Sequence, residues 1–315
     1  MGKVRVGVVG IGHLGNYHLQ KYQKLSDADI VGVSDALEER TLQASILFKC
    51  NPFKDYRDMI GHVDAVSIAV PTASHYLVAK DFLEAGVDVL LEKPIAVNMD
   101  EAKALCSIAQ SQCLIFQIGF VERFNPAILA LEKIIDRPLF IEAHRLHPFF
   151  ARGTDVDVIL DLMIHDIDII IKFVNSPLND VAAAGVSVLS DRVDIANARL
   201  SFKNGCVANI TASRITGKTM QKIRFFSVNG YHVVDFAKRE LVSLSKKSNN
   251  GCQTDSVQNN VEILDHDPLE EEIRSFLDSV IRRTKPLVSA EDALPALDVA
   301  TTIIKKMNTA AGIIS

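Results

Sequence analysis

The sequence has no tryptophan, few aromatic residues and no long apolar run. None of its 315 residues is Trp and only 6% are aromatic, so neither function nor fold class can be argued from aromatic side chains. No stretch of about 18 residues or more is free of charge, so we expect no transmembrane helix and no membrane partner. The first ten residues lead directly into a strand pattern, which predicts no signal peptide.

A basic excess is also lacking. The 34 Lys and Arg residues face 39 Asp and Glu residues, and the net charge of −5 gives no support for a nucleic-acid partner. Cysteines are few, odd in number and scattered, so they predict neither a disulfide framework nor a CxxC metal site. A reducing cytoplasm is the expected compartment. The five are Cys50, Cys106, Cys113, Cys206 and Cys252.

What is present is the pattern of an α/β protein of two domains. Up to about residue 120, short apolar runs alternate with amphipathic helical stretches, which predicts a parallel sheet covered by helices on both faces. We expect this first domain over residues 1–122. The predicted strands are Val4–Val9, Ile30–Ser34, Ala65–Val70, Val87–Leu91 and Leu114–Ile118, and His75–Ala85 and Asp100–Gln110 are examples of the helices.

The pattern changes in residues 123–315, where successive strands follow one another without helices between them. Asn204-Gly205 and Asn229-Gly230 are typical hairpin turns, so we expect a mostly antiparallel open sheet with helices on one face. The other, semi-polar face could be solvated or could pack against another subunit. Polar residues 245–258 are interpreted as a loop. The predicted strands are Leu139–Leu146, Ala184–Leu189, Ile195–Phe202, Cys206–Arg214, Ile223–Val228 and Tyr231–Phe236, and the helices are Pro126–Ile135, Asp155–Val174, Leu269–Arg283 and Glu291–Asn308.

A glycine-rich turn follows the first strand and opens a helix, in the order Gly10-Ile11-Gly12-His13-Leu14-Gly15. Such a turn lets the backbone approach a pyrophosphate, and the helix N-terminus offers N–H groups to it. Asp35 ends the second strand, where an acidic residue binds the adenosine ribose. Its charge favours NAD over NADP, although Arg40 leaves NADP open.

Ligands of such sheets bind beyond the carboxyl ends of the strands. The third predicted strand ends in Val70-Pro71-Thr72, followed by His75, and the next ends in Glu92-Lys93-Pro94. We take these residues as candidates for cofactor contacts. Lys93 precedes a proline, which holds it extended at the strand tip. A solvated lysine there, and a histidine that merely fits the first turn of its helix, are the plainer alternatives.

One polar line runs along an otherwise apolar helix. Asp161, His165, Asp168 and Lys172 recur at helical spacing within residues 157–174. They either line a cleft or form a ladder of ion pairs. In a cleft, Asp161 would orient His165 as a general base. A metal site completed by His144 or His147 lacks a ligand-spacing motif, so we expect no metal.

Several segments together resemble the Gfo/Idh/MocA oxidoreductase family across both domains. They are VGVVGIGHLGNYH, PTASH, LLEKPIA, DLMIHDID and the closing PLEEEIRSFLDSVIRRTKPLVSAEDALPAL. The resemblance implies a Rossmann domain, a C-terminal open sheet that serves as the interface of a homodimer or homotetramer, and NAD as cofactor. It also implies that Lys93, Asp161 and His165 are catalytic.

Further segments, GFVERFNPA, His144-Arg145 and ASRIT, resemble the subgroup of UDP-N-acetylglucosamine 3-dehydrogenases, whose 3-keto sugar is later aminated for lipid A. The implied substrate is a sugar or nucleotide sugar whose secondary hydroxyl is oxidised to a ketone. Planar guanidinium groups suit a diphosphate. A free polyol or monosaccharide dehydrogenase, and a non-catalytic dinucleotide sensor, are the alternatives. The candidates for diphosphate or sugar contact are Arg123, Arg145, Arg152 and Arg214.

Overall fold

The computed structural model describes residues 2–150, 156–228, 230–248, 254–260, 263 and 266–311. They form two compact units, each with its own sheet. The first unit comprises Met1–Val121 and Asp267–Leu294, and the second comprises Glu122–His266 and Pro295–Ser315. The sequence predicts that the chain passes from the first domain to the second once, after residue 122, which lies beside the first boundary between the units. It does not predict that Asp267–Leu294 returns to the first unit.

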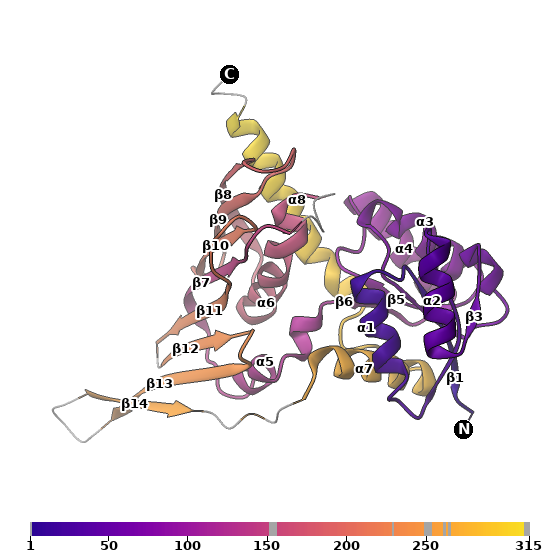
Figure 1. The fold of residues 1–315 in the computed structure, drawn as a ribbon. Helices are drawn as coiled ribbons and strands as arrows, with labels where there is room; N and C mark the ends of the chain where they lie inside the picture. The colour runs from indigo at the N-terminus through magenta and orange to yellow at the C-terminus, as the bar shows by residue number, and fades with distance from the viewer. Residues whose placement is uncertain are drawn as a thin grey trace. The chain divides into compact units, whose positions relative to one another are not determined.

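The first unit is built on a six-stranded sheet in the order β3-β2-β1-β4-β5-β6, with every pairing parallel. Strand β4 is buried along its whole length, because helices cover both faces of the sheet (Figure 1). The strands are β1 (Val4–Val9), β2 (Ala28–Ser34), β3 (Asn51–Pro52), β4 (Ala65–Ile68), β5 (Asp88–Glu92) and β6 (Phe116–Gly119). The α-helices are α1 (His13–Tyr22), α2 (Glu38–Phe48), α3 (His75–Glu84), α4 (Met99–Ser111) and α7 (Pro268–Arg282), with short 3₁₀ turns at Tyr56–Met59 and Thr72–Ser74.

Helix α7 explains why the chain returns to this unit. Asp267 caps it by accepting a hydrogen bond from the Glu270 N–H at 3.0 Å, and Pro268 occupies the first helical position. Its apolar face joins the core formed by β1 and α1, and Figure 1 shows α7 beside α1. The buried apolar residues of this face are Ile273, Phe276, Leu277 and Val280.

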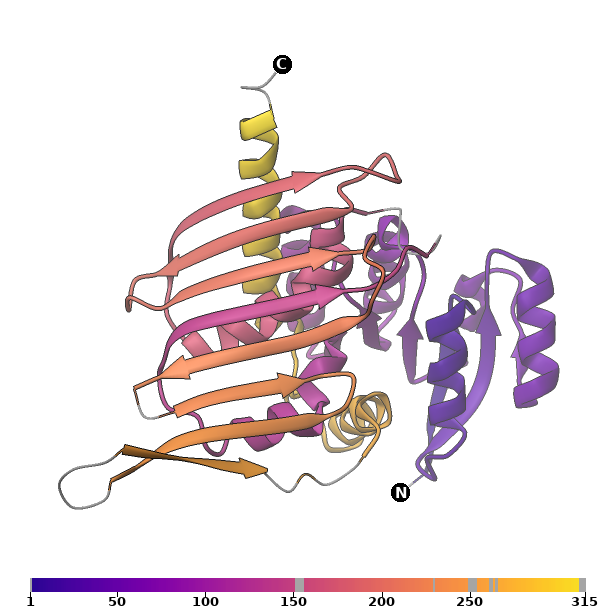
Figure 2. The ribbon, with the colours of Figure 1, turned by 60° about the vertical axis from the view of Figure 1, so that its left-hand side comes forward.

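The second unit contains an eight-stranded sheet in the order β14-β13-β12-β11-β7-β10-β9-β8, which Figure 2 shows broadside. Among the described residues β7 and β10 form its one parallel pair, so the prediction of a mostly antiparallel sheet is confirmed. The strands are β7 (Pro138–Leu146), β8 (Leu178–Val186), β9 (Ile195–Phe202), β10 (Val207–Ser213), β11 (Met220–Ser227), β12 (Gly230–Asp235), β13 (Glu240–Ser248) and β14 (Thr254–Asn260).

The interpretation of residues 245–258 as a loop is wrong at residues 245–248 and 254–258, and residues 249–253 lie outside the described residues. Strands β13 and β14 lie there and pair antiparallel, with Val242 opposite Asn260 and Ser248 opposite Thr254. Backbone hydrogen bonds form a ladder whatever the side chains are, and a strand at the margin of a sheet has less need of an apolar face. The polar composition of these residues therefore did not indicate the antiparallel pair of strands.

Helices cover one face of the second sheet, as the alternation in β10 predicts. Ala208, Ile210 and Ala212 are buried beneath them, whereas Asn209 and Thr211 are partly exposed on the other face. Figure 2 shows the helices behind the strands. They are α5 (Pro126–Leu131), a π-helical turn (Ile159–Met163), α6 (Ile164–Val174) and α8 (Ala290–Ala311), and a 3₁₀ turn spans Val121–Phe124. In the part of the chain that the structure describes, no helix is long and apolar enough to cross a membrane.

Candidate active site

The glycine-rich turn after β1 has the geometry of a pyrophosphate-binding loop. Gly10 has a φ of +88°, and a Cβ there would lie 2.6 Å from the carbonyl carbon and oxygen of Ala69. At Gly15 a Cβ would lie 1.9 Å from the Gly10 carbonyl oxygen, so only glycine lets α1 begin this close to the turn. At Gly12, in contrast, a Cβ would meet nothing within 4 Å. Open space beside this backbone, at a helix N-terminus, fits the phosphates of a dinucleotide.

The side chains within this turn differ in exposure. Ile11 is 2% exposed and joins the core, whereas Leu14 is 43% exposed and His13 is also exposed. His13 and Leu14 therefore border the open side of the loop. Ile11 holds it to the sheet.

Asp35 connects the end of β2 to the same turn. Its Oδ2 accepts a hydrogen bond from the Ile11 N–H at 2.6 Å, and its Oδ1 accepts one from the Leu37 N–H at 2.8 Å. A carboxylate has about four lone-pair sites, so both oxygens retain capacity for ribose hydroxyls. The half-exposed Arg40 places an Nη1 atom 3.9 Å from Oδ1. The predicted neighbours of an adenosine ribose are thus together.

His75 joins the ends of two strands instead of facing outward. Its ring is 1% exposed, with Nδ1 2.7 Å from the Pro94 carbonyl oxygen and Nε2 2.9 Å from the Val70 carbonyl oxygen. Burial lowers its pKa, so the imidazole is neutral and donates to one carbonyl at a time. Contact of this ring with a cofactor stays a prediction. Among its neighbours, Pro71 is exposed and Thr72 is buried.

Lys93 lies at the tip of β5 and is half-buried. The residue before it, Glu92, is 7% exposed and accepts a hydrogen bond from Nε2 of His18, an α1 residue, at 3.0 Å. Pro94, which follows, is held through its carbonyl by His75. The lysine is therefore flanked on both sides by anchored residues.

Asp161 and His165 lie in the second unit where a π-helical turn becomes α6. Asp161 belongs to the turn and His165 to the first turn of α6, and both are half-buried. Single π turns within helices occur frequently at functional sites, because the wider turn redirects side chains. Further along α6, Asp168 accepts hydrogen bonds from Nε of Arg123 at 2.5 Å and from its Nη2 at 2.7 Å. Lys172 forms an ion pair with Glu132. Two of the four residues of the predicted polar line, Asp168 and Lys172, thus form ion pairs with residues of other elements.

The predicted arginines occupy different environments, and Arg152 lies outside the described residues. Arg145 is 3% exposed; its Nη2 lies 3.0 Å from Oδ1 of Asp166 and its Nη1 2.9 Å from Oε1 of Glu122. Arg214 is 1% exposed and donates from Nε to Oδ1 of Asp194 at 2.9 Å. Contact with a diphosphate stays a prediction for all four.

Asp194 is the centre of a buried polar cluster. Its Oδ2 accepts hydrogen bonds from the backbone N–H groups of Val188, Leu189 and Ser190, at 2.6–3.0 Å. Burial opposes ionisation of the carboxyl, but the hydrogen bonds from Ser190, Leu189, Val188 and Arg214 outweigh it and hold its pKa well below the usual range. This cluster fixes the loop between β8 and β9.

The sequence analysis missed one group that could hold a metal ion. His18, Glu92 and Glu272 are buried, and one potential ligand atom from each lies within 4.8 Å of the others. His144 and His147, the predicted alternatives, form no such group among the described residues. His147 Nδ1 instead lies 2.6 Å from the Pro148 carbonyl oxygen.

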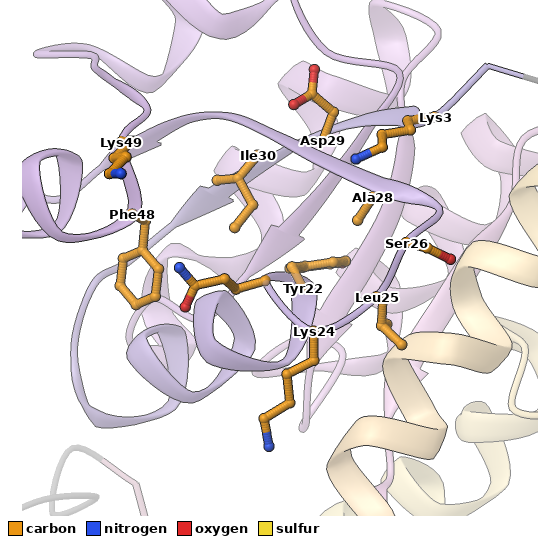
Figure 3. Close-up of a pocket in the computed structure, with 11 residues that line it drawn as sticks. Lys3, Tyr22, Lys24, Leu25, Ser26, Ala28, Asp29, Ile30, Phe48 and Lys49 are labelled. Atoms are coloured by element: carbon orange, nitrogen blue, oxygen red, sulfur yellow. The ribbon is translucent and has the colours of Figure 1, made fainter.

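A hollow of about 300 Å³ lies at the amino ends of strands of the first sheet, opposite the glycine-rich turn (Figure 3). Lys3, Ala28 and Lys49 line it, near the amino ends of β1 and β2 and the C-terminal end of α2. Dinucleotides bind at the carboxyl ends of parallel strands. This hollow is therefore not the nucleotide site.

Comparison with known proteins agrees with this geometry. Residues 4–120 match an oxidoreductase family with an NAD-binding Rossmann fold, and residues 152–313 match the C-terminal alpha/beta domain of the same family. The chain is similar to a UDP-N-acetylglucosamine 3-dehydrogenase of Acidithiobacillus ferrooxidans, with 37% identity over 279 residues and 88% of each chain covered. A solved structure of that enzyme superimposes with a TM-score of 0.90 at 34% identity, covering 98% of this chain and 99% of that one.

A more distant relative is a myo-inositol 2-dehydrogenase of Thermotoga maritima, with 26% identity over 318 residues and 93% of each chain covered. Both relatives are dehydrogenases by name. The fold predicted from the sequence, a parallel Rossmann sheet followed by a mostly antiparallel sheet, is confirmed.

Proposed function

Because this chain belongs to the Gfo/Idh/MocA oxidoreductase family, we propose that it oxidises a secondary hydroxyl of a nucleotide-linked amino sugar to a ketone. The observation that carries the proposal is the 37% identity to a UDP-N-acetylglucosamine 3-dehydrogenase across 88% of both chains. Identity of that extent, covering both domains, supports a shared substrate class as well as a shared fold.

NAD is the preferred cofactor in this proposal. When bound, it supplies the chemistry by accepting a hydride from the carbinol carbon. Gly12 leaves room for its pyrophosphate, and the Asp35 carboxylate binds the ribose hydroxyls while repelling a 2′-phosphate. The exposed Arg40 is the residue through which NADP could also be used.

Three side chains act on the hydroxyl group of the substrate. His165 accepts the hydroxyl proton as the carbon–oxygen bond gains double-bond character, and Asp161 orients the ring and stabilises its protonated form. Lys93 donates a hydrogen bond to the same oxygen, which stabilises the negative charge that develops there. Support for these roles comes from the family resemblance and from the half-buried position of all three residues.

For the diphosphate we retain Arg123 and Arg152 as proposed contacts; Arg123 also pairs with Asp168, but its side chain is more exposed than those of Arg145 and Arg214. Arg145 and Arg214 are buried against carboxylates, and we infer that they stabilise the second unit instead. A buried guanidinium that left its carboxylate would leave an uncompensated charge, which costs several kcal/mol. Their engagement with a ligand is therefore unfavourable.

We also place the enzyme in the cytoplasm, as a homodimer or homotetramer that associates through the outer face of the eight-stranded sheet. That face carries paired polar side chains, such as Asn197 and Thr211 at 2.9 Å and Arg199 and Asn209 at 3.1 Å. The ketone product is suited to amination, which agrees with a role in supplying amino sugars for lipid A.

The second candidate is a dehydrogenase of a free polyol, which the 26% identity to a myo-inositol 2-dehydrogenase favours. A substrate screen that follows nicotinamide absorbance separates the two, with UDP-linked amino sugars in one arm and free inositols and monosaccharides in the other. Reduction of NAD by the UDP-sugars alone supports the proposal. Activity with free polyols alone supports the second candidate, and NAD binding without reduction in either arm supports a non-catalytic sensor.

A further inference from the structure

The residue that precedes Lys93 is held from one side of β5. Glu92 is the last residue of β5, and Lys93 follows it in a bend. The peptide bond between Lys93 and Pro94 is cis. The Glu92 carboxyl points toward α1, where Nε2 of His18 lies 3.0 Å from its Oε1. His18 is 0% exposed, and its Nδ1 has no hydrogen-bond partner, so the tautomer with its proton on Nε2 donates to Glu92.

A second acid reaches the same carboxyl from α7. Glu272 is 0% exposed, and neither of its carboxyl oxygens has a hydrogen-bond partner. Its carboxyl nevertheless lies within 4.8 Å of the Glu92 carboxyl and the His18 ring. Burial, together with the negative charge of Glu92, raises its pKa well above the usual value. The uncharged form avoids repulsion of Glu92.

The neighbouring strand and α3 complete the enclosure. Gly119 of β6 lies opposite Glu92, and a Cβ there would be 3.2 Å from the carboxyl carbon of Glu92. The side chain of Glu92 thus packs so closely on Gly119 that an added Cβ requires a shift of a few tenths of an ångström. On the other side of Lys93, the His75 ring holds the Pro94 carbonyl.

We propose that His18 is a positioning residue for Lys93, on which it acts by holding the Glu92 carboxyl against α1. The backbone at the tip of β5 then has one position, and the Lys93 amine projects from it reproducibly. This rests on the proposed function, in which Lys93 contacts the substrate oxygen. Displacement of a catalytic group by about 1 Å can cost about a hundredfold in rate.

A bound divalent cation is the competing explanation for the same three side chains. Two carboxylates and an imidazole are suitable ligands for Zn²⁺. Elemental analysis of the purified protein decides between them. We expect no stoichiometric metal, and one equivalent of zinc that is lost in the Glu272→Gln variant would overturn the proposal.

The test compares His18→Leu with His18→Gln, because glutamine retains an N–H donor where leucine has none. Hydrogen exchange is followed in peptides that cover residues 88–98, and kcat and the Kd for NAD are measured in parallel. In the leucine variant we expect exchange in this segment to rise about tenfold and kcat to fall about tenfold or more, with the Kd for NAD within about twofold. The glutamine variant should retain both properties. Unchanged exchange in the leucine variant, or equal losses in the two variants, would overturn the proposal.

Gly119→Ala provides the same test without changing a polar group, should His18→Leu fail to fold. Its added methyl displaces the Glu92 carboxyl, so exchange in residues 88–98 should rise and kcat should fall while NAD still binds. No change in either quantity contradicts the proposal. Lys93→Ala separates this inference from the function it rests on. Full activity in that variant removes Lys93 from the mechanism, whereas the exchange measurements still report whether His18 holds the strand tip.

Discussion

The Oδ2 atom of Asp35 accepts a hydrogen bond from the Ile11 backbone N–H at 2.6 Å. This bond joins the end of β2 to the glycine-rich turn after β1, and it orients the carboxylate expected to bind the adenosine ribose. In the proposed function, cofactor preference therefore depends on a single side chain that also holds the glycine-rich turn.

Replacement of Asp35 by serine should therefore weaken NAD binding and improve NADP binding. Hydrogen bonds to a charged group contribute about 1.5–3 kcal/mol, so the Kd for NAD should rise about tenfold or more. NADP should bind more tightly than in the wild type, because repulsion of the 2′-phosphate is removed and Arg40 is nearby. Isothermal titration calorimetry with each nucleotide measures both values.

Asp29→Ser is the matched control for this change, since Asp29 is an exposed acid of β2, the strand that Asp35 follows. It should leave both dissociation constants unchanged. An Asp35→Ser protein that keeps the wild-type preference for NAD would show that the carboxylate does not contact the ribose.

The Arg214–Asp194 pair predicts a large effect on stability. Asp194→Asn removes a buried carboxylate that pairs with the Arg214 guanidinium, and breaking a buried pair typically costs about 3–5 kcal/mol of the free energy of unfolding. Asp64→Asn, which breaks the exposed pair with Arg5, should cost far less, because solvent screens that pair. Urea denaturation followed by circular dichroism compares the two. Equal losses would contradict the structural role inferred for Arg214.

Asp194 also predicts an acid limit to stability. Its pKa is lower in the folded state than in the unfolded chain, so its contribution is fully present above the ordinary aspartate pKa. That contribution is lost as pH falls toward the folded-state value. The Asp194→Asn protein should lack this part of the acid destabilisation, and its stability curve should be flatter below about pH 4.

Glu272 predicts the opposite dependence. The folded protein keeps a proton on this carboxyl that the unfolded chain releases near the ordinary glutamate pKa. Stability therefore falls as pH rises above about 4.5, by up to about 1.4 kcal/mol per pH unit for one proton, until the folded-state pKa is passed. Glu272→Gln should remove this fall. Urea denaturation of both proteins between about pH 5 and pH 8 tests it, and parallel curves would contradict a protonated Glu272.

The sequence was sufficient for features that depend on neighbours along the chain. The GxGxxG turn needs its glycines because the backbone of Gly10 touches Ala69 and a Cβ at Gly15 would collide with Gly10. Asp35 follows at a fixed spacing. Alternation in β10 likewise predicted which face is buried, because only one register hides Ala208, Ile210 and Ala212.

Features that depend on distant residues could not be predicted. The apolar face of α7 indicates that the helix packs against other elements, but it does not identify β1 as one of them. His18 and Glu92 are 74 positions apart, and Glu272 lies far beyond both, so no spacing connects them. The environment of Arg145 could not be predicted either. The affinity of guanidinium groups for phosphate suggested a substrate contact, but the fold buries Arg145 against Asp166.

The proposed mechanism requires Lys93 and His165 to act on one substrate hydroxyl. It is tested most directly by single-turnover oxidation of the UDP-linked amino sugar that the substrate screen identifies, with Lys93→Ala, His165→Ala, the double variant and an exposed control, Lys80→Ala. We predict that each single variant loses about 10²-fold or more in rate while NAD affinity is retained, and that the double variant loses less than the product of the single losses. Lys80→Ala should match the wild type. Near wild-type turnover in either single variant would contradict the account.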